Sequence, residues 1–398
     1  MHDASAFRSV QHDARYAADQ LAAFIAQAIA ADVHPPRLLA EATWELWEFA
    51  RSPTPTHAEG IPWPSTDPGA EVGEMRRRDF LTGTLAVTGT VLSETLAGMR
   101  PVDPEFITRA LNTTHAYRQL IHTATARDYL GPLLRHAASM RDLAQQASDG
   151  LRAGCLTAYG DATAEAAWIV ADGRHSALAG KLAREALDAA TDAGNHDLSA
   201  YCYGVLGLFT AHQQNDPYGG LRFVGRGMDE SKHATAVTRA YVAAVTAELH
   251  SLTGSRYRTL ASLEQADSHL ERADLSDSPS WLRTFAPARV QHYRGACLAR
   301  VGHARYAATI LHDALGRHGQ SSNNRALILA DLTTAYVRLK EPEQACTMLS
   351  RAIESVRDSR SAMRFERLTT ARSLLDPWQH ESFVRELDEQ LTTVAVTL

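Results

Sequence analysis

The chain has 398 residues and a formal net charge of −6; 45% of its residues are hydrophobic and only 7% are aromatic. A free-standing nucleic-acid-binding protein is more often basic, so the overall charge gives no support to that role. No apolar run reaches the ~18 residues of a membrane span, and the amino terminus lacks a cationic segment followed by an apolar one, so the sequence predicts a cytoplasmic protein.

The first 51 residues are predicted to form an amino-terminal helical segment with helices over 16–31 and 36–50. Two helices across a short turn are compatible with a helix-turn-helix. However, Glu41, Glu45 and Glu48 lie on the polar side of the second helix, where they would face phosphates. Docking against the next domain is therefore favoured, and direct DNA binding stays an unsupported alternative.

Residues 52–74 contain five prolines and three glycines and are predicted to be an extended linker. We therefore assign 75–398 to a single repeat domain. The domain begins with MRRRDFL, residues 75–81, which matches the twin-arginine export pattern. Because some 75 residues precede it and the following apolar run is interrupted, a basic helix start is the better interpretation.

From residue 103 onward, helical apolar patterns follow one another as pairs. The predicted helices are 103–123, 128–147, 152–171, 174–193, 198–212, 218–231, 235–252, 256–273, 286–300, 304–317, 324–339, 342–357, 362–375 and 379–394. Gly173, Gly194, Asn215, Gly254 and Gly302 are expected to end helices in a left-handed conformation. The last pair is expected to be a closing cap.

Five of these helices share a pattern of small and large residues at helical spacing. The pattern places small residues at positions 186, 227, 266, 314 and 352, at intervals of 41, 39, 48 and 38. Examples are Ala307, Leu311, Ala314 and Leu315, and again Ala345, Leu349, Ala352 and Ile353. Such a period predicts an all-α solenoid of tetratricopeptide-like helical hairpins, wound as a right-handed superhelix.

The one long interval contains ADLSDSPSWLRTFAP, residues 273–287, which is predicted to be an inserted loop with a role in binding. In a superhelix of hairpins, the first helix of each pair lines a continuous concave groove. The candidate ligand-binding residues are the aromatic and arginine side chains on these helices and on the loop: Trp168, Tyr201, Tyr241, Trp281, Arg289, Tyr293 and Tyr336. The alternative for each is an ordinary core position.

No motif fixes a reaction. The sequence contains no HExxH, GxSxG, GxGxxG or P-loop, so no metal, cofactor or catalytic residue is predicted. Cys155, Cys202, Cys297 and Cys346 lie in apolar helical patterns and are expected to be buried and reduced. Six arginines between positions 351 and 372 could meet phosphate or an acidic partner, but a solvated charged face is the ordinary explanation.

Three segments together resemble a large group of actinobacterial regulatory proteins with tetratricopeptide repeats. They are RRRDFL (76–81), SPSWLRTFAPARVQHYRGACLARVG (278–302) and RALILADLTTAYVRLKEPEQAC (325–346). Members of that group commonly carry an amino-terminal helix-turn-helix, then the RRxFL segment, then the repeats. This sequence departs from them because its first 50 residues lack a clear helix-turn-helix pattern.

The leading hypothesis is a noncatalytic regulatory protein that binds a small molecule, a peptide or a partner protein in the groove. Its expected role is in transcriptional regulation. One alternative is an enzyme of a biosynthetic pathway with its site in the same groove. Another is an assembly scaffold, with homodimerisation through the terminal helices.

Overall fold

The computed structural model of the chain describes residues 103–121, 127–283, 285, 287–318, 322–359 and 361–395. The chain divides into two compact units, Met1–Ala116 and Tyr117–Leu398. The predictions for the amino-terminal helix pair, the linker and the RRRDFL segment fall outside the described residues.

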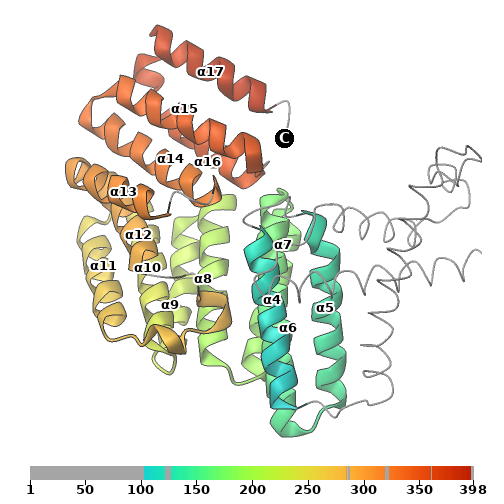
Figure 1. Cartoon of the computed structure of the whole chain (residues 1–398). Coiled ribbons are helices and arrows are strands. Elements are labelled where there is room, and N and C mark those ends of the chain that lie inside the picture. The colour runs from blue at the N-terminus through green and yellow to red at the C-terminus, as the bar shows by residue number, and fades with distance from the viewer. Residues whose placement is uncertain are drawn as a thin grey trace, which may run out of the picture. The chain divides into compact units, whose positions relative to one another are not determined.

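The described residues form helices and no strands, and these helices pack as a series of hairpins (Figure 1). The first helix of each hairpin, called here the first arm, packs mainly against the second arm that follows it. The hairpins are α6 (Asp149–Asp172) with α7 (Ser176–Asp192), α8 (His196–Gln213) with α9 (Pro217–Ser231), α10 (Ala236–Leu252) with α11 (Arg256–Glu271), α12 (Pro287–Arg300) with α13 (Ala304–His318), and α14 (Ser322–Leu339) with α15 (Pro342–Ser359). The helices α4 (Pro104–Ile121) and α5 (Arg127–Gln146) come before them, and α16 (Ala362–Ser373) and α17 (Ser382–Ala395) come after.

This arrangement confirms the predicted all-α helical-repeat solenoid, and the helix ends agree with the predicted ones to within a few residues. The right-handed superhelix stays a prediction. None of the described helices is long and apolar enough to cross a membrane.

The repeated small and large positions lie in the core. In α13 and α15, Ala307, Leu311, Ala345 and Leu349 have no exposed surface. In α9 the pattern consists of Gly220, Val224, Gly227 and Met228, and it fails at the last position, because Met228 is 38% exposed. The small residues let helices approach closely, as the spacing predicted.

Two glycines show how close the approach is between α8 and α9. A Cβ atom on Gly207 would lie 2.5 Å from Val224 Cγ2, and one on Gly220 would lie 2.6 Å from the Gly207 carbonyl oxygen. Real Cβ atoms do not come this near to other heavy atoms, so only glycine fits at this crossing.

Most of the predicted left-handed turn residues have positive φ: Gly194 (65°), Asn215 (53°), Gly254 (71°) and Gly302 (96°). The turn between α6 and α7 differs, because Gly173 has φ −79° and the next residue, Arg174, takes the left-handed conformation at φ 63°. The prediction for Gly173 was therefore wrong by one residue.

Helix α16 packs against α14 and also against α6, the first arm of the first hairpin. Asp172, the last residue of α6, accepts a hydrogen bond from the Ser361 hydroxyl and one of 3.3 Å from the Met363 backbone N–H. It also lies 3.8 Å from the Arg364 guanidinium. The segment after the last hairpin therefore connects the array back to its beginning, while α17 packs on α15.

Candidate functional site

Aromatic side chains from successive first arms form a row on the face of these helices that we call the inner face. The Trp168 indole N–H donates a hydrogen bond of 3.1 Å to the Tyr201 hydroxyl. The rings of Tyr201 and Tyr241 follow with centroids 5.2 Å apart. Four of the predicted ligand-binding residues, Trp168, Tyr201, Tyr241 and Tyr293, lie in this row, and their role in ligand binding stays a prediction.

The inserted loop lies on this row and joins its two halves. Phe285 stacks edge-on against Tyr241, with ring centroids 5.5 Å apart, and its ring lies 6.4 Å from that of Tyr293. Trp281, in the short 3₁₀ helix η3 (Ser280–Leu282), is 6% exposed, and Leu282 is 3% exposed. The inner face is therefore covered over these residues by a segment of the same chain.

Two buried polar atoms at this part of the inner face have no hydrogen-bond partners. The Tyr241 hydroxyl and the Trp281 indole N–H are both buried, and neither forms a hydrogen bond. Burial raises the pKa of Tyr241 well above its usual value, so its hydroxyl stays protonated. An unsatisfied buried polar group costs about 1–3 kcal/mol. A ligand that supplied partners to these two atoms would recover part of that cost.

A buried ionic cluster holds the loop in place. Arg118 on α4 bonds to Asp161 at 2.7 Å and to Glu165 at 2.6 Å, both on α6. The same guanidinium donates to the carbonyl oxygen of Ser280 at 3.2 Å, and the Ser280 hydroxyl donates to Asp161 at 3.0 Å. Because Arg118 and Asp161 each bond to both a neighbouring helix and Ser280, the loop is fixed to α4 and α6 together.

The charge state of the cluster follows from its burial. Burial disfavours the charge of Arg118, but Asp161 and Glu165 outweigh this effect and raise the pKa of Arg118. Burial raises the pKa of Glu165, with Arg118 acting in the opposite direction. Burying an ion without a partner costs free energy, and the ion pairs with Arg118 offset part of that cost for the two acids at the inner face.

A second cluster lies at the other end of the inner face. Asp331 on α14 contacts three cationic or polar groups: His292 Nε2 at 2.9 Å, Arg300 at 3.3 Å and Arg367 at 3.1 Å. Glu248 on α10 takes 3.1 Å and 3.4 Å contacts from His212 and Arg367. Arg367 on α16 thus joins two first arms.

These contacts set the ionisation of both acids. Burial opposes the charge of Glu248, but a hydrogen bond from His212 and the charges of His212, Arg367 and Arg300 hold its pKa well below its usual value. Burial also opposes the charge of Asp331, and Arg367, His292 and Arg300 lower its pKa. Both carboxylates are therefore ionised and fully engaged at neutral pH.

His292 is held in one tautomer. An arginine can only donate, so the 3.1 Å contact of Arg289 with Nδ1 makes that nitrogen the acceptor, and Nε2–H donates to Asp331. Burial, followed by the charge of Arg289, lowers the pKa of His292 against the opposing effect of Asp331. Both ring nitrogens are occupied, so His292 does not offer the free nitrogen that a general base needs.

Other features of the described residues bear on chemistry. They contain no group of three or more histidine, cysteine or acidic side chains arranged to hold a metal. Cys155, Cys202, Cys297 and Cys346 are buried and unpaired, as predicted.

Three of the six arginines in the arginine-rich segment do not belong to the solvated charged face that the sequence favours. The side chains of Arg364, Arg367 and Arg372 are 17%, 23% and 15% exposed and pair with acids of the same chain. Their charges therefore serve internal contacts. Arg372 bonds to Asp388 at 2.5 Å and so ties α16 to α17.

The remaining predicted site residues have different places. The Arg289 guanidinium lies over the ring of Tyr293, 5.4 Å from its centroid, where the aromatic row meets the second cluster. Tyr336 lies apart from the row, with its hydroxyl 2.8 Å from His312 Nε2 and its ring against the His312 ring.

Sequence reasoning missed the acids of the inner face. Asp161, Glu165 and Asp172 recur together with Trp168 at spacings of four, three and four, which places all four on one side of α6. That pattern was available in the sequence. The identity of their partners was not, because Arg118 lies 43 residues from Asp161 and 162 residues from Ser280.

No protein-family model and no curated protein sequence matches the chain. The resemblance to repeat-containing regulators therefore rests on the residues quoted above.

Proposed function

We propose that the chain is a noncatalytic, tetratricopeptide-like regulatory protein whose inner face binds a peptide segment of a partner protein in place of the inserted loop. The observation that carries this proposal is the loop itself. A surface that buries Trp281, Leu282 and Phe285 from its own chain has the shape and chemistry to accept similar side chains from another.

The two unsatisfied polar atoms support replacement of the loop. The loop residue Phe285 lies against the Tyr241 ring, but the buried Tyr241 hydroxyl has no hydrogen-bond partner, and neither has the buried Trp281 N–H of the loop itself. A partner peptide that hydrogen-bonds to Tyr241 would hold an advantage over the loop of roughly 1–3 kcal/mol per group satisfied. The loop has its own advantage, because it is covalently attached and so has a high effective concentration at the inner face. The hydrogen bonds of the partner peptide would offset part of that advantage.

The contacts of Ser280 suggest how binding would be communicated. Removing the loop breaks the bonds of Ser280 to Arg118 and Asp161. Arg118 lies on α4, a helix whose amino-terminal part belongs to the first unit. We infer that loop release alters α4 and through it the amino-terminal unit. The role in transcription rests on the resemblance of residues 76–81, 278–302 and 325–346 to the regulatory group.

The test uses the loop sequence as a free peptide. A fluorescent peptide DSPSWLRTFAP, residues 277–287, is titrated with the full chain and with the double variant Trp281→Ala/Phe285→Ala, and binding is followed by anisotropy. The double variant, whose loop lacks its anchors, should bind the peptide at least roughly tenfold more tightly than the unaltered chain.

The matched control is the same peptide with serine in place of its tryptophan and phenylalanine, which should not bind either protein. Equal binding of the two peptides, or no binding by a double variant that circular dichroism shows to be folded, would contradict the proposal.

A further inference from the structure

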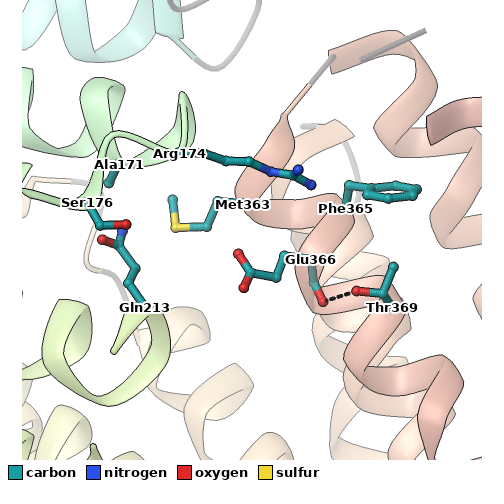
Figure 2. A pocket seen from close by; sticks show the side chains of 8 residues that line it. All are labelled: Ala171, Arg174, Ser176, Gln213, Met363, Phe365, Glu366 and Thr369. Carbon is teal, nitrogen blue, oxygen red and sulfur yellow. Dashed lines mark hydrogen bonds between the residues drawn. The ribbon is translucent and has the colours of Figure 1, made fainter. Parts of the chain in front are cut away.

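A separate pocket of about 340 Å³ lies where the end of the array returns to its beginning. Figure 2 shows its walls, which come from the α6–α7 turn, the end of α8 and the helix α16. Its size is within the range of small-molecule sites. None of the residues of the aromatic row lines it.

The α6–α7 turn, α7 and α8 bring hydrogen-bond donors to the pocket. Arg174 reaches over the pocket in Figure 2, and no acid of the described residues pairs with its guanidinium. The Gln213 side-chain nitrogen is buried and has no hydrogen-bond partner. Ser176, which also lines the pocket, is the first residue of α7, and no side chain caps this helix. Its free backbone N–H groups add positive potential there.

The conformation of the turn fixes the position of the arginine. Arg174 has φ 63°, a conformation that a non-glycine residue rarely adopts. Its backbone N–H donates to the Ala171 carbonyl at 3.0 Å, and that of His175 donates to the Val170 carbonyl at 3.2 Å. These bonds hold the turn, so the arginine leaves the backbone toward α16.

The helix α16 brings acidic and apolar side chains to the pocket. The Glu366 carboxylate faces the pocket in Figure 2, and no cation of the described residues forms an ion pair with it. Met363 adds apolar surface next to it, whereas the ring of Phe365, which also lines the pocket, points away from Met363 in Figure 2. An unpaired cation and an unpaired anion thus line one small pocket without contacting each other.

We propose that this pocket binds a small zwitterion of amino-acid or dipeptide size. Its carboxylate would lie at Arg174, its ammonium group at Glu366, and its apolar side chain on Met363. A simple anion would meet the repulsion of Glu366, and a simple cation that of Arg174, whereas a zwitterion satisfies both.

Binding in the pocket would add contacts between the α6–α7 turn and the α16 segment, which are already in contact. Asp172, next to the pocket residue Ala171, contacts Ser361 and the Met363 backbone N–H. A ligand between the α6–α7 turn and α16 adds contacts across the same closure and favours the closed array. This site is independent of the inner face and of the peptide proposed to bind there.

The experiment is isothermal titration calorimetry on the full chain with L-leucine and L-leucyl-L-leucine. Leucinamide and 4-methylpentanoate serve as comparators, because each lacks one of the two charges of leucine. At least one zwitterion should bind saturably, with both single-charge analogues roughly tenfold weaker or more.

The variants assign each charge to a residue. Arg174→Gln should weaken the zwitterion and 4-methylpentanoate alike by roughly tenfold, whereas Glu366→Gln should weaken the zwitterion and strengthen the binding of 4-methylpentanoate, because it removes the repulsion between Glu366 and the anion. Arg184→Gln on α7 and Glu264→Gln on α11 alter exposed residues away from the pocket and should change nothing.

Three results would overturn the proposal. They are the failure of both zwitterions to bind at millimolar concentration, equal affinity for 4-methylpentanoate, and equal losses in the pocket variants and their controls.

Discussion

Replacing Tyr241 by phenylalanine is predicted to stabilise the fold, whereas the same change at Tyr201 is predicted to destabilise it. The two residues are 5% and 6% exposed and their rings are 5.2 Å apart, so the changes remove the same atom from similar surroundings. They differ in hydrogen bonding. The Tyr201 hydroxyl accepts from Trp168, whereas the Tyr241 hydroxyl has no partner.

The expected magnitudes follow from that difference. Losing the Trp168 bond costs about 0.5–1.5 kcal/mol, while removing an unsatisfied buried hydroxyl recovers about 1–2 kcal/mol of desolvation. The two variants should therefore differ by about 1.5–3.5 kcal/mol. At about 2–4 °C per kcal/mol for a domain of this size, their melting temperatures should differ by roughly 3–14 °C.

The assay is thermal and urea denaturation of the full chain, followed by circular dichroism at the helical band. Both variants are compared with the unaltered protein under the same conditions. If Tyr241→Phe lowers stability as much as Tyr201→Phe does, the Tyr241 hydroxyl has a stabilising partner. The argument that a partner peptide gains free energy by supplying a hydrogen bond to the Tyr241 hydroxyl would then fail.

Three further changes test other parts of the structure. Asp331→Asn should cost about 3–5 kcal/mol of unfolding free energy in urea, because it leaves Arg300 and Arg367 with one buried carboxylate fewer; the exposed Asp277→Asn should change it by less than about 0.5 kcal/mol. Burial lowers the pKa of His292, so as the pH falls below about 6.5 this histidine is protonated in the unfolded chain before it is protonated in the folded chain. The free energy of unfolding should therefore fall there by up to about 1.4 kcal/mol per pH unit. His292→Gln should remove that part of the slope between pH 7.5 and 5.5, and an unchanged slope would refute the assignment. Gly207→Ala should destabilise by about 1–3 kcal/mol through its clash with Val224, whereas Gly225→Ala, which meets no atom within 4 Å, should be neutral or stabilising by up to about 1 kcal/mol.

The helices and their pairing could be predicted because the relevant signals are local. Small and large residues at spacings of three and four identify the buried side of a helix, and Ala345, Leu349 and Ala352 are fully buried as that rule requires. Most turns could be predicted from the positions of glycine and asparagine, because this signal is also local. The exception at Gly173 shows the limit, since Arg174 takes the left-handed conformation although glycine would adopt it at lower cost.

The aromatic row could be predicted in part. Spacing placed Trp168, Tyr201, Tyr241 and Tyr293 on the first arms, and the structure brings them into one row with the loop residue Phe285. Nothing local showed that the inserted loop would lie on that row. Whether a loop extends into solvent or folds back depends on contacts such as the one between Arg118 and Ser280, which are 162 residues apart.

The ionic clusters were the least predictable feature. Arg367 contacts Glu248 across 119 residues and Asp331 across 36. Charge patterns along one helix show which residues share a side but not which distant acid faces them. For that reason the sequence favours a solvated face for the arginine-rich segment, although three of its arginines are largely buried.

The most direct test of the proposed function is hydrogen–deuterium exchange of the full chain with and without an excess of the peptide 277–287. If the peptide replaces the loop, amides of residues 275–283 should lose protection and exchange faster, while those around Tyr201 and Tyr241 on the first arms stay protected. If the peptide binds and the loop amides keep their protection, the peptide occupies another surface, and the inner face is not the binding site.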